Sequence, residues 1–558
     1  MITRFRPVRR AARVVALALA GALALAACGT GGSGGGTNEG ASAVPLIVPR
    51  EDMGTFVRNF NPFSPTVAPM TQQAVYEPMF VYNPADGSTT PWLATEWRTS
   101  DDGKELTFSL RDGVQWSDGE PLVAQDVVTT FELQKKLLGG LDYLEKAEAV
   151  DDATVVFHLN RVSSPALYEI GQQIIIPDHV WSEVDDPAKD ANETPVGTGP
   201  YTEVLSFENQ SFDLGPNPSY WQPEKQKIPS IRMLAFAGND GANLAAANGE
   251  VDWAPQFIPN IEQAFVARDP EHNHYWFPPT GSMINWQLNT TKAPYDDVDV
   301  RKALSMAIDR EQIVNVAMQG YTHPADCTGL SGGYDTWRDQ SLADSCEWTQ
   351  RDVEAANALL DEAGYPRGGD GNRTLKDGSP FTVTISVGST SSDWLSVAEI
   401  ISQNLAEIGV EATVDSPDWS AVVAGYEEGS FDSGIVWSNN APTPYQFYRG
   451  TMSTETVKPV GEQTLENYHR FGDEQADALL TELAATTDQD AQRTIVNELQ
   501  AEFDAEAPVI PLFPGPEWGA YTDARFTGWP SEDDPYATLS TRAPTTVLVL
   551  TTLEPAQG

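Results

Sequence analysis

The side chains that could carry out catalysis are not arranged here in the common catalytic motifs. No His-Glu-x-x-His zinc motif and no Gly-x-x-x-x-Gly-Lys-Ser/Thr phosphate loop occurs. The six histidines are dispersed, and the close pair His272 and His274 lies on a polar stretch, so we predict no metal site. Eighty acidic residues leave open a carboxylate pair spaced for glycoside hydrolysis. We nevertheless predict a binding protein rather than an enzyme.

The three cysteines point to sulfur chemistry outside the cytoplasm. Cys28 lies near the N-terminus, which leaves Cys327 and Cys346 as a pair. An even remainder in an exported chain indicates one disulfide. The intervening residues Gly329–Tyr334 are typical of a loop, so the bond would close a surface excursion. Two cysteines without nearby histidines are too few ligands for zinc.

The first 43 residues carry the signals of export and anchoring. Five arginines precede residue 14, and the apolar run Val14–Ala27 is too short to span a bilayer. The sequence Leu25–Gly29 resembles the lipobox of bacterial lipoproteins, in which the signal peptide is removed and lipid is attached to the cysteine. We therefore predict a signal peptide over 1–27 and a lipidated Cys28 that begins a flexible tether over 28–43. The alternative is an ordinary secretory signal with an incidental cysteine.

Composition excludes several classes of partner. The formal net charge of −46 repels nucleic acid and anionic lipid surfaces, so we predict no nucleic-acid binding. The acids are scattered rather than clustered, which is typical of a solvated acidic surface. The membrane would be contacted through the lipid alone, on the outer face of the cell membrane.

The elements that must position any site alternate between strands and helices. Leu106, Phe108 and Leu110 alternate with polar residues, and Asp112-Gly113 then predicts a hairpin turn toward Trp116. The apolar residues of 300–308 recur at helical spacing after a possible cap at Asp299. A second helix is predicted over 353–363, ending at a glycine with a proline just beyond. The mixture indicates an α/β fold with at least two lobes.

A series of motifs extends over nearly the whole chain past the tether. The segment Leu93–Gly119 contains two tryptophans and three Asp-Gly pairs, and Ala124–Val127 follows it. Further motifs occur in order at Gly197–Tyr201, Asn217–Trp221, Gly249–Trp253, Val300–Arg310, Ala363–Pro366 and Pro508–Leu512. Together they resemble the family 5 extracellular solute-binding proteins of ABC importers, which are oligopeptide, dipeptide, nickel and oligosaccharide receptors.

The resemblance implies a periplasmic-binding-protein-like fold (type II, cluster C) in which two lobes close on a ligand. Chain crossings near Asn285–Asn289 and Pro511–Pro516 would form the hinge. The implied segments are 44–85, 200–285 and 515–558 for the first lobe, 86–199 for an inserted domain, and 286–514 for the second lobe. The receptor would deliver its ligand as a monomer to an ABC permease with separate ATPase subunits, and no cofactor is implied.

The ligand class is left between a neutral oligosaccharide and an oligopeptide. Peptide receptors of this family commonly place an aspartate shortly after a tryptophan, to pair with the peptide amino group. In Phe431–Pro444, Asn439 and Asn440 follow Trp437 where that acid is expected, and an amide is a poor partner for an ammonium. Asparagine and tryptophan suit sugar hydroxyls and ring faces. We therefore favour a cello- or manno-oligosaccharide, with a peptide as the alternative.

The candidate ligand-binding residues come from both implied lobes. Asn61 lies in a segment resembling a loop of the first lobe that approaches ligand. The full set of candidates is Trp437, Asn439, Asn440, Trp286, Trp394, Trp419, Asn61 and Tyr76.

Overall fold

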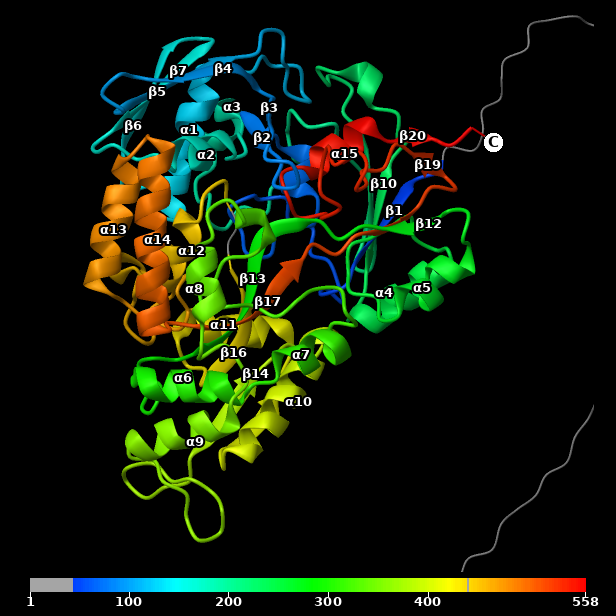
Figure 1. Ribbon diagram of the computed structural model, residues 1–558. Helices are drawn as coiled ribbons and strands as arrows, with labels where there is room; N and C mark the ends of the chain where they lie inside the picture. The colour runs from blue at the N-terminus through cyan, green and yellow to red at the C-terminus, as the bar shows by residue number, and fades with distance from the viewer. Residues whose placement is uncertain (1–43, 439–440, 558) are drawn as a thin grey trace, which may run out of the picture. The chain divides into compact units, whose positions relative to one another are not determined.

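A five-stranded sheet is assembled from segments that lie far apart in the sequence (Figure 1). The computed structural model describes residues 44–438 and 441–557. From edge to edge the strands are β15 (Glu411–Asp415), β14 (Thr382–Ser386), β16 (Ser433–Trp437), β13 (Pro279–Leu288) and β17 (Ile510–Pro516). β14 is parallel to β15 and β16, whereas β13 is antiparallel to β16 and β17. The β13–β17 pair therefore joins the middle of the chain to its last fifth.

The helices beside this sheet begin at aspartate caps. Asp297 accepts a hydrogen bond from the backbone amide of Asp299, so it is Asp297 that caps α6, and Asp299 lies in the first turn. Asp352 and Asp418 cap α9 and α11 in the same way. The helices of this region are α6 (Val298–Ala307), α7 (Arg310–Gln312), α9 (Val353–Glu362), α10 (Ser392–Glu407) and α11 (Trp419–Glu428). The two helices predicted around 300–308 and 353–363 are present, the first starting two residues earlier.

A separate apolar core lies around the disulfide. The sulfurs of Cys327 and Cys346 are joined, with the two Cα atoms 5.7 Å apart. Both cysteines are buried among aromatic residues that include Tyr334, Trp348 and Phe447. The helices that contribute to this core or flank it are α8 (Gln340–Ser345), α12 (Tyr445–Met452), α13 (Glu474–Ala485) and α14 (Gln489–Glu506).

Two further sheets are formed by the first and last parts of the chain. One has the order β1 (Leu46–Arg50), β10 (Ile231–Ala235), β9 (Ser211–Pro216) and β8 (Tyr201–Glu208). The other has the order β11 (Trp253–Ala254), β18 (Ala520–Thr522) and β12 (Asn273–Tyr275). The remaining elements here are α4 (Asn239–Ala247), α5 (Ile261–Ala264), α15 (Thr546–Thr552), and the strand pair β19 (Phe526–Thr527) and β20 (Glu554–Pro555).

The predicted hairpin after Leu110 is wrong in its partner. β5 (Glu105–Leu110) pairs with β4 (Ala94–Thr99) and with β7 (Thr154–Leu159), not with residues 114–116. Gly113 does turn the chain, with φ of 76°, but Gln115 then bridges to Pro121. The local turn signal was correct, but strand pairing was decided by burial of the alternating face.

The other elements of this segment are β6 (Leu144–Asp151), α1 (Ala124–Leu137), α2 (Ala166–Gly171), α3 (Asp178–Trp181), β2 (Phe80–Tyr82) and β3 (Thr89–Pro91).

The core is continuous between the segment 86–199 and the sheet of β1. Phe80 packs against Trp97 with ring centroids 4.7 Å apart, and against Phe108 at 6.3 Å. Phe80 and Phe108 belong to one hydrophobic cluster that also contains Leu46, Phe212 and Val549, and Trp97 packs against this cluster. Because no solvent separates these layers, we expect the segment 86–199 to move as one body with the first and last parts of the chain.

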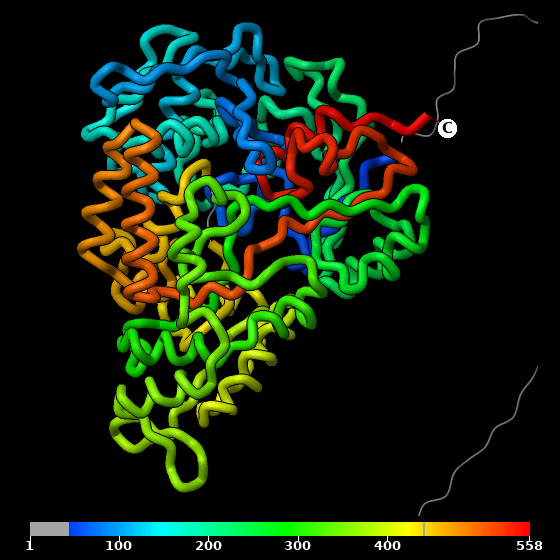
Figure 2. Tube along the Cα trace, viewed as in Figure 1, coloured from blue at the N-terminus to red at the C-terminus, as the bar shows by residue number. Residues whose placement is uncertain are grey.

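Two adjacent connections join the sheet of β12 and β18 to the sheet of β13 and β17. The connections are residues 276–278 and 517–519, and the backbone amide of Trp276 donates to the carbonyl oxygen of Gly519 at 2.9 Å. Most of the predicted crossings, 285–289 and 511–516, lie within β13 and β17 instead. The crossing point is displaced because β13 and β17 pair along their length before the chain changes sheet (Figure 2).

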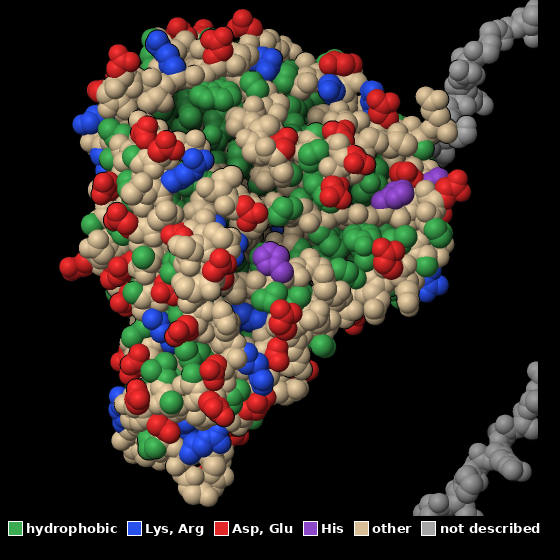
Figure 3. Space-filling model, in the orientation of Figure 1, with side chains coloured by type: hydrophobic (Ala, Val, Ile, Leu, Met, Phe, Trp, Pro, Cys, Tyr) green, Lys and Arg blue, Asp and Glu red, His purple; other side chains and the backbone are tan. Residues whose placement is uncertain are grey.

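The surface of the described residues is acidic and mixed. Figure 3 shows Asp and Glu scattered over one face with Lys and Arg among them, as the composition indicates. Within residues 44–438 and 441–557, none of the helices combines the length and the apolar character needed to cross a membrane.

Candidate ligand-binding site

A cavity of about 690 Å³ opens between the two sheets that the connections join. One wall comes from the side of the five-stranded sheet and includes Ser282, Trp394 and Trp437. The opposite wall includes Trp518 and Arg542. A smaller space of about 160 Å³ adjoins it and shares Trp394, Trp437 and Trp518. A cavity of this size, with aromatic faces and a few polar groups, is typical of a small-molecule site.

Three tryptophans form one aromatic cluster on the wall of the five-stranded sheet. The ring centroids of Trp437 and Trp419 lie 5.7 Å apart in a stacked arrangement, and Trp394 lies 5.7 Å from Trp437 and 6.2 Å from Trp419. Trp437 ends β16, whereas Trp394 and Trp419 lie in the first turns of α10 and α11. Trp437 is 46% exposed, although it is among the largest apolar side chains. An exposed, pre-stacked tryptophan presents a flat face to a ligand.

Gly388 allows this cluster to form. A β-carbon at Gly388 would lie 2.7 Å from the ring of Trp419, closer than packed atoms approach. The absence of a side chain therefore lets Trp419 lie directly against the backbone. The cluster depends on a residue that contributes no side chain to it.

Trp518 supplies an aromatic face on the opposite wall. Its ring lies 5.1 Å from Phe257 and 4.9 Å from Phe277, measured between centroids. Trp518 lies within the second connection, residues 517–519. Both walls of the cavity therefore offer aromatic side chains to a ligand.

Asp393 places a carboxyl group in the cavity wall next to Trp394. Burial raises the pKa of Asp393 to about 6, opposed by backbone amides at the start of α10. Among the residues that the structure describes, no cation forms an ion pair with it, and the charged group that most affects it is the like-charged Glu51. An acid that is largely ionised at neutral pH and has no cationic partner is suited to a ligand ammonium group.

Glu517 and an arginine pair complete the polar lining. Burial raises the pKa of the Glu517 carboxyl group, against a hydrogen bond from Ser540. Arg542 donates to Glu51 at 2.7 Å and to Asp52 at 3.0 Å, and these two acids raise its pKa. Arg50 also pairs with Asp52, at 2.6 Å. Four acids and one arginine, Arg542, thus line the two adjoining spaces, so their electrostatic balance favours a cation.

The structure brings together three of the predicted residues, Trp437, Trp394 and Trp419, at one site. The other second-lobe candidates, Asn439 and Asn440, lie outside the described residues. Sequence reasoning did not select Trp518, Asp393, Glu517 or Arg542. The sequence feature that could have indicated Asp393 is its position directly before Trp394. That feature does not distinguish it from the other acids, of which the chain has 80 in all.

Three further predicted residues, Trp286, Asn61 and Tyr76, lie in the interior, away from this cavity. Trp286 is fully buried in the core beneath the five-stranded sheet, because it faces inward on β13. The amide of Asn61 donates to the carbonyl oxygens of Pro187 and Asp190, so it holds a loop. The hydroxyl of Tyr76 accepts from Asn192 at 2.7 Å, and burial raises its pKa. None of the three lines the cavity.

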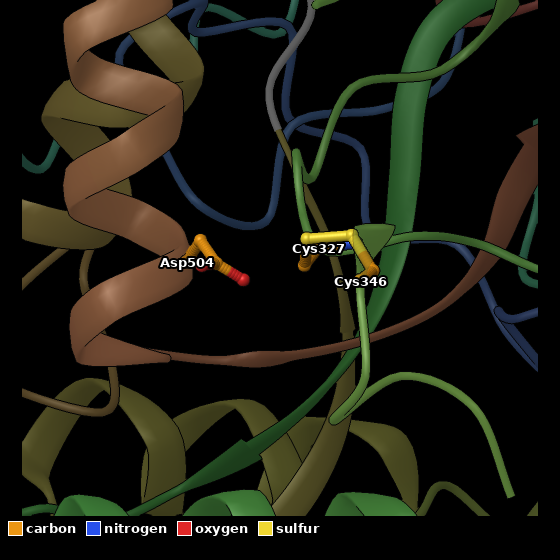
Figure 4. Close-up of side chains that lie close together, drawn as sticks. All are labelled: Cys327, Cys346 and Asp504. Atoms are coloured by element: carbon orange, nitrogen blue, oxygen red, sulfur yellow. A yellow bond between two sulfur atoms is a disulfide. The ribbon is translucent and has the colours of Figure 1, made fainter. Parts of the chain in front are cut away.

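The one grouping of potential metal ligands among the described residues does not form a metal site. It consists of Cys327, Cys346 and Asp504, shown in Figure 4. Both sulfurs are used by the disulfide, and Asp504 accepts a hydrogen bond from the indole of Trp348 at 2.9 Å. His272 and His274 instead contact Asp523 on the surface, at 2.7 and 3.3 Å.

Two sheets, two connections between them and an aromatic, acidic cavity beside the connections define a ligand receptor of the two-lobe periplasmic-binding type. Comparison with known sequences identifies the family. The sequence model of the bacterial extracellular solute-binding proteins, family 5 (middle region), matches residues 88–458, so the chain belongs to this family. It is therefore the substrate-binding component of an ABC importer and acts outside the cytoplasm.

Individual relatives have different ligands in their names. The nickel-binding periplasmic protein of Escherichia coli is 26% identical over 85% of this chain and 88% of its own length. The glutathione-binding protein of Escherichia coli is 27% identical over 75% of this chain and 79% of its own length. A periplasmic oligopeptide-binding protein from Thermotoga maritima, crystallised with mannohexaose, is 26% identical. It has a TM-score of 0.83 and covers 92% of this chain and 99% of its own.

Proposed function

We propose that the cavity binds a short peptide, whose amino group is held by Asp393. The observation that carries this proposal is a buried, cation-free carboxyl group beside an exposed tryptophan. The sequence favoured a sugar because asparagine stands where an acid was expected after Trp437. An acid comes to the same cavity from α10 instead, which removes that reason. The names of two relatives, an oligopeptide-binding and a glutathione-binding protein, agree with a peptide ligand.

A neutral oligosaccharide is the second candidate. The stacked tryptophans present the flat apolar faces on which sugar rings pack. The relative from Thermotoga maritima was crystallised with mannohexaose, although its name is that of an oligopeptide-binding protein. The two candidates differ in charge, which makes them separable.

Calorimetric titration decides between the two classes. Di- to pentapeptides, their N-acetylated forms, and cello- and manno-oligosaccharides would be titrated into the purified protein. We expect binding of free peptides, at least tenfold weaker binding of the acetylated forms, and little response to sugars. Tight sugar binding with no peptide response would overturn the peptide proposal.

The proposed transport cycle uses the two connections as a hinge. The segments 276–278 and 517–519 lie side by side, so bending there would bring the two walls of the cavity together on the ligand. The permease would bind the closed form. We further propose that the lipid at Cys28 keeps the receptor near the permease, on the support of the lipobox-like sequence.

No catalytic step is proposed for this cavity. It contains several carboxyl groups, so the remote alternative of a glycoside hydrolase is tested directly. Incubation with cello-oligosaccharides, followed by chromatography of the products, is expected to return the substrate unchanged. Appearance of shortened products would show that the protein is an enzyme.

A further inference from the structure

A second cavity of about 450 Å³ lies beside the first, and we call it the side chamber. One wall is the segment 164–173, which includes Tyr168 and Gln172. The opposite wall is formed by residues 441–443 and by Trp337, Gln489 and Gln492. The side chamber therefore lies between the inserted segment and the helices around the disulfide.

Gln446 separates the side chamber from the main cavity. Its side chain lines both spaces. The amide of Gln446 donates to one carboxylate oxygen of Glu169, and the other oxygen accepts from the hydroxyl of Tyr143. A ligand chain that entered the side chamber past Gln446 would have to displace this amide from Glu169. The freed Glu169 oxygen can then accept an N–H group of that ligand.

The backbone that bounds the side chamber is held in place. The hydroxyl of Tyr334 accepts from the amide of Ala441 at 2.8 Å and donates to its carbonyl oxygen at 2.9 Å. Burial raises the pKa of Tyr334, which keeps the hydroxyl protonated and able to donate. Tyr334 thereby fixes residue 441 against the core around the disulfide.

The chemistry of the side chamber suits an uncharged polar chain. Four glutamines line it besides Gln446, and an amide both donates and accepts hydrogen bonds. Within the described residues, the side-chain amides of Gln172 and Gln489 make no hydrogen bond to the protein, and Gln172 is half-buried. Glu169 is the one charged residue in the wall, and it would repel a terminal carboxylate.

We propose that the side chamber is a second subsite that binds the part of a long ligand distal to Asp393. The inference rests on the proposed peptide function for the direction of the chain. The subsite takes neutral peptide units through Gln172 and Glu169, and it makes the receptor selective for longer ligands over dipeptides.

The test is the dependence of affinity on ligand length. Alanyl peptides of two to six residues with amidated C-termini would be titrated into the wild type, Gln172→Ala, Gln172→Trp and the matched control Gln210→Ala, which alters an exposed glutamine in a turn. We expect the affinity of the wild type to rise with length. Gln172→Ala should weaken the hexapeptide about threefold, and Gln172→Trp, which fills the chamber, about tenfold or more. The dipeptide should change less than twofold in every variant.

Each outcome decides the proposal. An affinity of the wild type that is independent of length, or an equal loss for short and long peptides, would overturn the side chamber as a subsite. If peptides fail to bind but oligosaccharides bind, the proposed peptide function is wrong. The same variants with two- to six-unit oligosaccharides then test the side chamber, and the same selective loss for the long members would support it.

Discussion

At the scale of single residues, identical side chains serve opposite purposes in this protein. Trp437 and Trp286 lie on neighbouring strands of one sheet, yet Trp437 is nearly half exposed and Trp286 is fully buried. Both side chains lie on the same face of the sheet, because Trp437 pairs with Ile284 and Trp286 follows Ile284 by two residues. Trp437 is exposed because it ends its strand at the cavity, whereas Trp286 lies further along, within the core. The two residues form a natural pair for mutagenesis.

Replacement of Trp437 by alanine is expected to remove binding without unfolding the protein. The affinity for ligand should fall at least tenfold, because a stacking face is lost, while the melting temperature should fall by only about 1–2 °C. Trp286→Ala is the matched control, and the cavity it leaves should cost about 3–5 kcal/mol of unfolding free energy. Calorimetric titration and thermal denaturation measure both. A large loss of stability in Trp437→Ala would show that this residue is structural.

The proposed role of Asp393 predicts a specific pH dependence of the affinity for ligand. An ammonium ligand requires the ionised acid, whose pKa is about 6. Affinity should therefore be constant above neutral pH and fall about tenfold between pH 7 and pH 5, as the carboxyl group takes up a proton. In Asp393→Asn the affinity should be low throughout and the pH dependence absent. A variant with unchanged affinity and an unchanged pH profile would contradict the role of Asp393.

At the scale of elements, one buried carboxyl group connects three loops, one of them in the segment 86–199. Glu77, between the turn at 71–75 and β2, accepts hydrogen bonds from Trp92 at 2.7 Å, Tyr220 at 3.1 Å and Trp221 at 3.2 Å. Trp92 follows β3, and the other two follow β9. The inserted segment is thus tied to the sheet of β1 by polar contacts as well as by its continuous core.

The stability of this region should depend on pH through Glu77. Burial raises its pKa from 4.5 to about 7, so the folded protein retains a proton that the unfolded chain has already lost. The contribution of Glu77 to the free energy of unfolding therefore falls by about 3 kcal/mol as the pH rises from 4.5 to about 7. Outside that window its contribution is constant. Urea unfolding of the wild type and Glu77→Gln across this range measures the difference. Parallel stability curves for the two proteins would contradict it.

At the scale of the whole molecule, binding and delivery are separate properties. The cavity walls described above belong to residues 51–544, whereas the proposed anchor at Cys28 lies outside the described residues. A receptor held near its permease has a raised effective concentration there, although its intrinsic affinity for the solute is unchanged.

Cys28→Ala is expected to separate these properties. The variant should be released into the medium and bind its ligand with unchanged affinity, while uptake by the cells falls. Cell fractionation, calorimetry and a transport assay measure the three effects. Retention of the variant in the membrane fraction would show that the anchor lies elsewhere.

The sequence alone determined the family, the α/β class, the two half-cystines and three of the tryptophans of the cavity, Trp394, Trp419 and Trp437. These follow from local patterns: ordered motifs, periodicity, and residue types that are rare enough to stand out. The tertiary structure decided which tryptophans are exposed, where the chain changes sheet, and that Asp393 lies in the wall of the same cavity as Trp437. These depend on contacts between segments far apart in the chain. A sequence does not display such contacts, because the free energy of burial is set by the partner across the interface and not by the neighbours along the chain.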